Sequence, residues 1–283
     1  MTGDSKPSRF HKFAVALALF VLLAYVLPLG LTYAFQRQLL YQPDTAPVGD
    51  PATFGLPDMK VIAVKTEDGL ELKDWFRPPK NGDKYTMVIF HGSYVTLGHV
   101  ATVARMLKGD HGLFLCEYRG FGGSPGTPTE QGIYADARAA VKWLVDNGYP
   151  ADHLIFYGAS MGTGVAVQMA LETRPAMLIL HSPYASITAI AKEYYPFFPV
   201  DWLLKDRFDS VGKIGKVHAP LLILHGMEDD MIPIASARQL FAAANDPKEF
   251  MAVAHFQHIN FLFSPGIFKA INAWIDKQIA AAH

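Results

Sequence analysis

The sequence has almost no cysteine and no excess of charge of either sign. Cys116 is the only cysteine, which excludes an intrachain disulfide and a cluster of thiolate metal ligands. Lys and Arg number 25 against 26 Asp and Glu, so the basic excess typical of nucleic-acid-binding proteins is missing. With 51% hydrophobic and 18% charged residues, the chain is too apolar for a disordered protein. We therefore expect a folded protein without a nucleic-acid partner.

Motifs for common cofactors are also missing. The chain contains neither a phosphate-binding P-loop nor a His-Glu-x-x-His zinc motif. His255 and His258 could share a metal ion, but no third ligand clusters with them in the sequence. We expect neither a cofactor nor a metal site.

One long apolar run, residues 13–35, contains no charged residue. As a helix it would span about 34 Å at roughly 1.5 Å per residue, enough to cross a bilayer core of about 30 Å. The run therefore predicts a transmembrane helix, with a cleaved signal peptide and a buried core helix as the alternatives. Lys6, Arg9 and Lys12 precede the run, and only Arg37 follows it closely.

The positive-inside rule then gives the topology. Residues 1–12 would form a cytoplasmic tail, and residues 36–283 would form one catalytic domain outside the cytoplasm, in the periplasm or a lumen. We therefore expect a single-pass membrane protein.

The rest of the chain alternates short apolar strands with helical patterns. Strands are expected at 59–65, 70–76, 86–90, 113–117, 153–157, 177–180, 221–224 and 250–253, and helices at about 98–108, 128–146, 161–173, 235–244 and 266–280. Thr127, Pro128 and Glu130 resemble a capping box at the start of the second helix. The alternation predicts an α/β fold, a mostly parallel sheet with helices on both faces. Residues 182–218 are too long for one crossover and predict a small helical cap.

The strongest chemical motif is Gly158-Ala159-Ser160-Met161-Gly162, between a strand and a helix. A serine on a tight strand-to-helix turn is exposed at the end of the sheet, and Gly158 and Gly162 allow the turn to close. Ser160 is therefore the predicted nucleophile. An idle serine in a glycine-rich turn is the alternative.

A serine hydroxyl needs a general base, and the base needs an orienting acid. In this kind of fold the acid and the histidine follow the serine in that order. Glu228, Asp229 and Asp230 come just after the strand 221–224, and His255 and His258 come after the next strand. The acid and the base are expected among these five residues.

Two backbone N–H groups should stabilise the oxyanion of the reaction intermediate. One is that of Met161, directly after the serine. The other is that of Ser93 or Tyr94, in the loop after the strand 86–90. Gly92 in this loop allows close approach to a substrate, and His91 is expected to anchor the loop by hydrogen bonds.

Together these residues resemble the α/β-hydrolase superfamily, and within it the Bem46-like group that includes the mammalian α/β-hydrolase domain proteins 13 and 17. The matching segments are 36–41, His91-Gly92, 118–122 with Ser124, 158–162, His225-Gly226 with Asp229, Ile232-Pro233, and 258–260. The resemblance implies a triad of Ser160, Asp229 and His258. The chain departs from many relatives at Ser93, where they have Asn, and at Glu117, where they have Asp.

The resemblance also implies a function. It indicates a membrane-anchored serine hydrolase that cleaves carboxylic ester or thioester bonds of a small-molecule or lipid substrate, or of a lipidated protein. A serine aminopeptidase and a catalytically inactive scaffold are the alternatives. The cap is rich in aromatic residues, and we expect some of them to line an apolar acyl site: Tyr184, Tyr195, Phe198 and Trp202.

Overall fold

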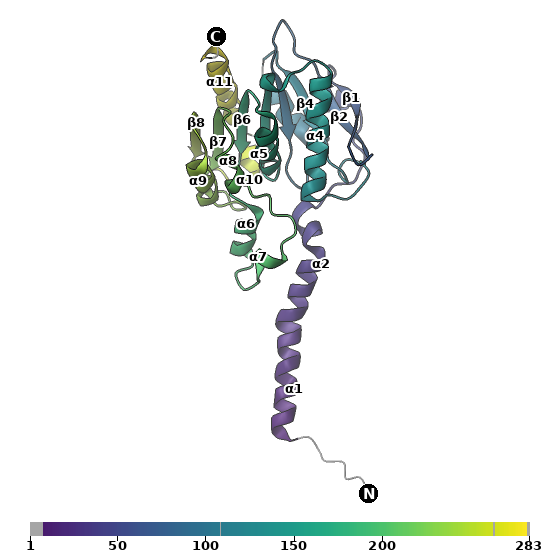
Figure 1. The fold of residues 1–283 in the computed structure, drawn as a ribbon, viewed down its shortest axis with the longest axis vertical. Coiled ribbons are helices and arrows are strands. Elements are labelled where there is room, and N and C mark those ends of the chain that lie inside the picture. Colours follow the sequence, from purple (N-terminus) through teal and green to yellow (C-terminus); the bar gives the residue numbers. More distant parts are fainter. Residues whose placement is uncertain (1–7, 108, 263, 282–283) are drawn as a thin grey trace.

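The computed structural model describes residues 8–107, 109–262 and 264–281. Lys6, with the rest of residues 1–7 of the predicted tail, lies outside these ranges. A single sheet forms the centre of the domain, in the order β1-β2-β4-β3-β5-β6-β7-β8 (Figure 1). The strands are β1 (Lys60–Lys65), β2 (Glu71–Arg77), β3 (Thr86–Phe90), β4 (Gly112–Cys116), β5 (Leu154–Ala159), β6 (Met177–His181), β7 (Leu221–Gly226) and β8 (Lys248–Val253).

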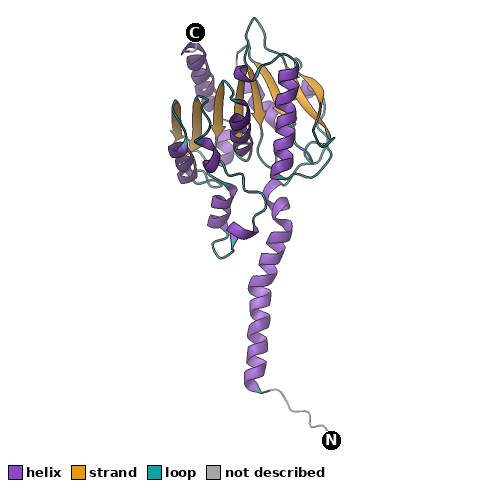
Figure 2. Cartoon of the chain, in the orientation of Figure 1, coloured by secondary structure: helices purple, strands orange, loops and turns teal. Residues whose placement is uncertain are grey.

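From β4 to β8 along this order, neighbouring strands pair in parallel. β2 runs in the opposite direction and pairs antiparallel with both of its neighbours, β1 and β4. Every residue of β3, β4, β6 and β7 is buried, as expected when helices cover both faces. Figure 2 shows the helices in front of and behind the strands. The α/β fold expected from the sequence, a mostly parallel sheet with helices on both faces, is confirmed.

The helices form two layers. α4 (Glu130–Asp146), α5 (Gly162–Thr173) and α9 (Ile234–Ala243) pack in one apolar cluster with one face of the sheet. α3 (Leu97–Met106) and α11 (Pro265–Ala281) pack in a second cluster with the other face. The parallel strands therefore end at one shared edge between the layers, where α/β proteins place their ligands.

The start of α4 differs from the predicted capping box. The helix begins at Glu130, and its N-cap is Thr129, whose hydroxyl accepts a hydrogen bond from the Gly132 N–H at 2.9 Å. Glu130 does not reach back to the cap, because its carboxylate accepts hydrogen bonds from the Arg207 N–H (2.7 Å) and the Tyr134 hydroxyl (3.0 Å). The helix therefore starts two residues later than predicted, and Thr127 and Pro128 precede it.

The N-terminal apolar run forms one helix that projects from the domain (Figure 1). It comprises α1 (Arg9–Val21), a π-helical segment (Leu22–Val26) and α2 (Leu27–Tyr41). The π segment lies just before Pro28, which has no N–H to donate into the helix. By length and composition, the 33 residues from Arg9 to Tyr41 can cross a membrane.

This helix is longer than the predicted 13–35, because its last turn packs into the domain. Tyr41 is completely buried, and its ring contacts that of Phe208 at 6.4 Å between centroids. Arg37 makes an ion pair with Asp206 at 2.7 Å. The segment after the apolar run is therefore a structural part of the domain.

The predicted cap lies between β6 and β7. It contains α6 (Ile187–Tyr194), α7 (Val200–Leu203) and α8 (Val211–Ile214). α6 and α7 lie at the end of the domain from which the long helix projects (Figure 1). A hydrogen bond of 2.8 Å from the Tyr25 hydroxyl to the Phe197 carbonyl oxygen connects the helix to the cap. The cap and the long helix are thus in direct contact.

Candidate active site

Ser160 occupies a strained turn between β5 and α5. Its φ is 52°, in the left-handed region that a non-glycine residue rarely adopts. A Cβ at Gly158 would lie 2.6 Å from the carbonyl oxygen of Gly162. A Cβ at Gly162 would overlap the carbonyl oxygen of Phe90. Glycine at both positions is therefore required for this turn, which exposes the Ser160 hydroxyl at the edge of the sheet.

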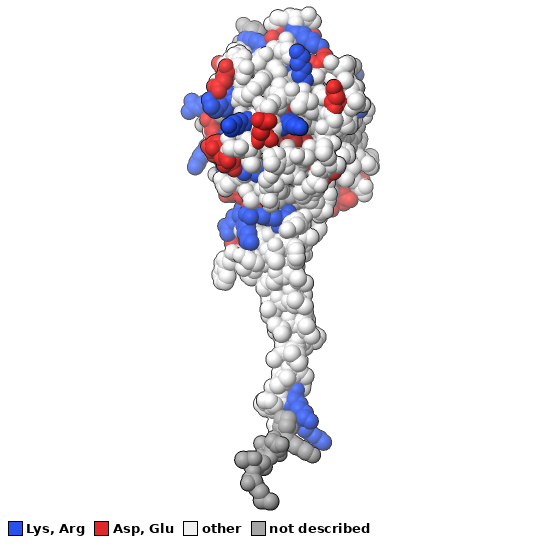
Figure 3. Space-filling model, turned by 90° about the vertical axis from the view of Figure 1, so that its right-hand side faces the viewer, with Lys and Arg blue, Asp and Glu red and all other residues white. Residues whose placement is uncertain are grey.

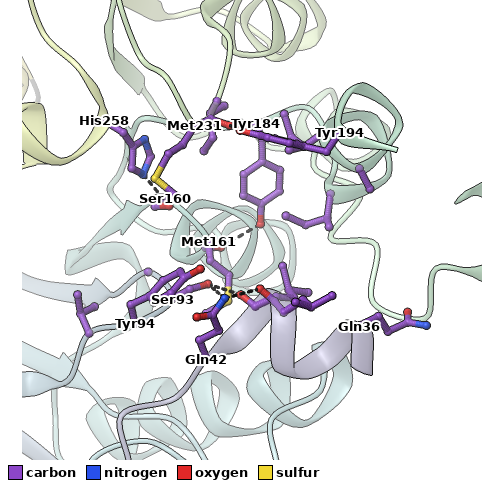
Figure 4. Close-up of a pocket in the computed structure, with 18 of the residues that line it drawn as sticks. Gln36, Gln42, Ser93, Tyr94, Ser160, Met161, Tyr184, Tyr194, Met231 and His258 are labelled. Atoms are coloured by element: carbon purple, nitrogen blue, oxygen red, sulfur yellow. Dashed lines mark hydrogen bonds between the residues drawn. The ribbon is translucent and has the colours of Figure 1, made fainter. Parts of the chain in front are cut away.

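A chain of hydrogen bonds joins Ser160 to two later residues. The Ser160 Oγ lies 3.0 Å from His258 Nε2, and His258 Nδ1 lies 2.7 Å from Asp229 Oδ2. Asp229 follows β7, and His258 is the first residue of α10 (His258–Leu262), a short helix not expected from the sequence. Figure 4 shows the His258 ring directed at Ser160. Three residues from distant parts of the chain thus form a serine–imidazole–carboxylate array.

The Asp229 carboxylate is held in its ionised form. Burial alone would raise the pKa of Asp229, but hydrogen bonds from His258 and the Ile232 N–H outweigh it, so the pKa lies below its usual value. Asp229 Oδ1 accepts from the N–H groups of Ile232 (2.7 Å) and Met231 (3.0 Å). These bonds fix the carboxylate, which can then orient the imidazole.

The neighbouring candidates do not join this array. The His255 side chain is 90% exposed and lies 3.2 Å from Glu228, which points to the surface as well. Asp230 Oδ1 accepts a long hydrogen bond of 3.4 Å from the His258 backbone N–H, so its carboxylate lies beside the array. The geometry favours Asp229 and His258 among the residues that the sequence left open.

The predicted oxyanion loop lies against the serine. A Cβ at Gly92 would come within 3.1 Å of the Ser160 Cβ, so only glycine allows this approach without displacement. His91 is buried, with Nδ1 2.8 Å from the Gly92 carbonyl oxygen and Nε2 3.0 Å from Glu117 Oε1. His91 therefore braces the loop and does not face the serine array, and Glu117 is its partner.

The two predicted loop donors differ in availability. The Tyr94 N–H already donates to the Tyr41 carbonyl oxygen at 3.3 Å, so the loop turns it away from a substrate. Within residues 8–107, 109–262 and 264–281, no hydrogen bond uses the N–H of Ser93 or Met161. Ser93 directs its hydroxyl to the Leu40 carbonyl oxygen at 2.8 Å, which connects the loop to the long helix. Ser93 and Met161 are the remaining donor pair.

Comparisons with known proteins agree with this fold. A family model described as serine aminopeptidase S33 matches residues 82–210. An uncharacterized protein of Mycobacterium tuberculosis is 36% identical over 228 residues, which cover 79% of this chain and 80% of that protein. Human α/β-hydrolase domain-containing protein 17B is 35% identical over 200 residues, 68% of this chain and 66% of that one.

Solved structures give the same result. An α/β hydrolase of Vibrio vulnificus has a TM-score of 0.69 at 19% identity, covering 86% of this chain and 92% of that one. The chain belongs to the α/β-hydrolase superfamily. The family resemblance read from the sequence is confirmed. An esterase of Pyrococcus furiosus also shares the fold of this hydrolase, with a TM-score of 0.65 at 17% identity over 84% of this chain and 98% of that one.

The serine of the hydrolase lies in a cavity of about 760 Å³. The edge of the sheet contributes Ser160, Met161 and His258, and the cap contributes Tyr184, Tyr195 and Phe198, as predicted from the sequence. The Tyr184 hydroxyl donates to the Met161 carbonyl oxygen at 3.0 Å (Figure 4). None of the described lining residues is Asp, Glu, Lys or Arg. The cavity therefore suits an apolar group next to the serine.

Two walls of this cavity differ from those predicted. Trp202 does not line it, because α7 turns this side chain outward and leaves it 87% exposed. The long helix forms a wall that was not predicted, lined by Leu29, Thr32, Tyr33, Gln36, Leu39 and Leu40. The segment 36–41 after the apolar run was the available signal, since it includes three of these lining residues. In the same segment Arg37 and Tyr41 contact the domain.

Proposed function

We propose that this hydrolase is membrane-anchored and cleaves ester or thioester bonds of acyl substrates through Ser160, His258 and Asp229. The observation that carries the proposal is the hydrogen-bonded array of these residues, with 3.0 Å and 2.7 Å between the bonded atoms, at the wall of an uncharged cavity. An inactive scaffold would have no reason to keep the strained Ser160 turn, which costs about 1–3 kcal/mol.

The proposed reaction proceeds through an acyl-enzyme. His258 Nε2 takes the proton of Ser160 as its Oγ attacks the substrate carbonyl, while Asp229 stabilises the imidazolium. The N–H groups of Met161 and Ser93 stabilise the negative oxygen of the tetrahedral intermediate. His258 then protonates the leaving alcohol or thiol. A water molecule, activated by the same histidine, hydrolyses the acyl-enzyme and restores the serine.

The cavity supports an acyl chain as the recognised group. Each methylene moved from water into an apolar site contributes about 0.8 kcal/mol, so catalytic efficiency should rise with chain length until the cavity is filled. The aromatic side chains of Tyr195 and Phe198 stack at 5.7 Å between centroids and form part of this apolar lining. Medium or long acyl esters are thus the proposed substrates.

A serine aminopeptidase is the second candidate, favoured by the description of the matching family model. An aminopeptidase must bind a free, positively charged amino group, and a carboxylate is the usual partner for such a charge. No acidic residue is present among the described lining residues. The uncharged lining therefore supports acyl esters over aminoacyl amides.

Labelling and turnover together test the proposal. A fluorophosphonate probe should label the native protein, and Ser160→Ala should abolish both labelling and ester hydrolysis while the unfolding transition is retained. A matched panel of acetyl to palmitoyl esters and thioesters, with aminoacyl amides beside them, then identifies the substrate class. Labelling that persists in Ser160→Ala would contradict the assigned nucleophile, and preferred cleavage of aminoacyl amides would favour the peptidase.

The proposed topology follows from the basic residues before the helix. Arg9 and Lys12 would stay in the cytoplasm, and the catalytic domain would lie on the other side. Protease added to intact spheroplasts or an equivalent sealed preparation should digest the domain. Complete protection would reverse the topology, and release by alkaline carbonate would contradict the anchor.

A further inference from the structure

The tip of the cap, residues 194–204, exposes large apolar side chains. Phe197 is 84% exposed and Trp202 is 87% exposed, more than almost any other large apolar residue of the folded domain. Asp201 is the only charged residue in the segment 194–204, and its carboxylate lies 2.8 Å from the Lys192 ammonium. Large apolar side chains exposed to water contribute nothing to the stability of a loop. The tip therefore needs an apolar partner.

The rise of the long helix gives the depth of this tip relative to the membrane surface. Tyr33 lies 20 residues after Phe13, the first residue of the uncharged run, which is about 30 Å at 1.5 Å per residue. The Lys205 ammonium lies 4.4 Å from the centre of the Tyr33 ring. A tyrosine beside a lysine is typical of the membrane–water boundary. Tyr33 therefore marks the boundary on the side of the catalytic domain.

The tip lies well below this boundary. Tyr25 is eight residues before Tyr33, about 12 Å deeper in the membrane by the same rise. Its hydroxyl bonds to the Phe197 carbonyl oxygen at 2.8 Å, and its ring contacts that of Phe198 at 5.8 Å. In Figure 3 no charged side chain is visible along the middle of the long helix. One basic group lies near its free end, and another lies where the domain begins.

We propose that the cap tip, with Phe197 and Trp202, inserts into the bilayer leaflet next to the catalytic domain, and that the acyl substrate reaches Ser160 directly from this leaflet. The second part rests on the proposed acyl hydrolase function. The partner is the lipid bilayer itself, because the helix that would span it holds the tip at hydrocarbon depth.

The cavity is placed for such a path. Leu29 and Thr32 line the cavity and lie on the helix between the depths of Tyr25 and Tyr33. An acyl chain could move from the leaflet along this wall to the serine without exposure to water, and an apolar chain strongly avoids such exposure. The helix is thus both an anchor and a wall of the substrate path.

Cysteine labelling tests the insertion without any assumption about activity. The native Cys116 is buried, so a new cysteine is the only accessible thiol. The full chain with Phe197→Cys is reconstituted in phosphatidylcholine vesicles and treated with a charged, membrane-impermeant maleimide. Val145→Cys, an exposed apolar site on α4, is the matched control. We expect the thiol of Phe197→Cys to react at least about tenfold slower than that of Val145→Cys, because lipid shields it.

A nitrobenzoxadiazole fluorophore provides a second measurement of depth. Attached to the Phe197→Cys thiol with a permeant reagent, it should be quenched by spin-labelled lipid, while the same fluorophore on the Val145→Cys thiol is not. Equal maleimide rates for the two variants, with no quenching in Phe197→Cys, would overturn the insertion.

Turnover tests the substrate path. We expect the double variant Phe197→Asp/Trp202→Asp to lose about tenfold or more in kcat/KM for a palmitoyl ester held in vesicles, because its tip no longer enters the lipid. Hydrolysis of a water-soluble butyryl ester should change by less than about twofold, because neither residue lines the cavity. Val61→Asp/Val145→Asp, at two exposed sites of the domain surface, should leave both activities unchanged.

The outcomes separate the two proposals. An unchanged palmitoyl activity, or an equal loss on both esters, would overturn the path through the leaflet. If the native protein hydrolyses neither ester, the proposed hydrolase function fails, and with it the substrate path. The labelling result would still decide whether the tip lies in lipid.

Discussion

The domain around the sheet and the N-terminal helix use the same apolar side chains in opposite ways. In the domain, Phe90, Phe114 and Leu180 are completely buried between the sheet and its helices. In the helix, Phe20 and Leu23 are more than half exposed, and only Tyr41 at the domain end is buried. Helical residues of a water-soluble protein would present a polar face, which residues 13–35 lack.

This difference assigns separate tasks to the two regions. The domain holds polar groups at fixed distances, as the Ser160, His258 and Asp229 array requires. The helix and the cap tip expose apolar surface, and other residues of the helix and the cap form walls of the cavity. The domain is therefore expected to be sensitive to changes of a single atom, while the helix and cap should respond mainly to changes in polarity or volume.

The largest effect is expected at the carboxylate of the array. Asp229→Asn should lower kcat by about 10⁴, because an amide neither fixes the imidazole tautomer nor stabilises the imidazolium. Asp230→Asn should have a small effect, since only a 3.4 Å hydrogen bond to the His258 N–H connects it to the array. Ester turnover of the two variants is the measurement. A severe loss of turnover in Asp230→Asn, with a mild loss in Asp229→Asn, would identify Asp230 as the acid of the array.

Two glycine substitutions compare the packing of the domain with that of the helix. A Cβ at Gly162 would overlap the Phe90 carbonyl oxygen, so Gly162→Ala should lower the free energy of unfolding by about 4 kcal/mol or prevent folding. Gly30 has no neighbouring atom within 4 Å of the same position. Gly30→Ala should be neutral or slightly stabilising, because alanine favours a helix over glycine.

Denaturant unfolding in detergent micelles measures both variants. A stable, fully active Gly162→Ala would show that the turn can relax, and the sharp contrast between domain and helix would be lost.

A larger side chain on the cap wall of the cavity should change the preference for acyl chain length and leave the chemical step unaffected. Ile190 lines the cavity from α6, so Ile190→Trp should shorten the space available to an acyl chain. The ratio of kcat/KM for octanoyl to that for acetyl esters should fall about tenfold, close to the loss of two buried methylenes. Val145→Trp, at an exposed site on α4, is the control. An unchanged ratio in Ile190→Trp would place the acyl chain elsewhere.

The smallest effect concerns two buried carboxylates of the domain with opposite pKa shifts. Burial raises the pKa of Asp74 well above its usual value, and one of its oxygens, Oδ2, has no hydrogen-bond partner among the described residues. Above pH 3.8 the unfolded chain has released this proton while the folded protein keeps it, so stability falls as the pH rises through this window. The depressed pKa of Asp229 acts in the opposite sense, with stability lost as the pH falls below 3.8.

Asp74→Asn should remove the first dependence, because the amide has no proton to lose and its oxygen can still accept from the Glu117 N–H. Its free energy of unfolding, relative to the native protein, should improve between pH 5 and 8 by an amount on the order of 1 kcal/mol. Urea unfolding across this pH range measures the difference. A parallel pH profile for the two proteins would show that Asp74 is already ionised in the fold.

Local patterns in the sequence predicted most of the domain. All eight strands were placed within two residues of their ends, because continuous apolar runs bounded by turn residues specify buried parallel strands. The Ser160 turn was predicted from two glycines, since only glycine fits the tight backbone there. The sequence also limited the acid and the histidine to five residues that follow two neighbouring strands.

Only the packing of distant segments decided the rest. Asp229 and Asp230 are chemically equal neighbours, and only the tertiary structure decides which carboxylate lies 2.7 Å from His258 Nδ1. Trp202 and Phe198 are both aromatic cap residues, yet one points outward and the other into the cavity. Composition and spacing specify which backbone a segment adopts, because those preferences are local. The direction in which a side chain points, and the helix wall beside Ser160, depend on contacts between segments that are distant in the sequence.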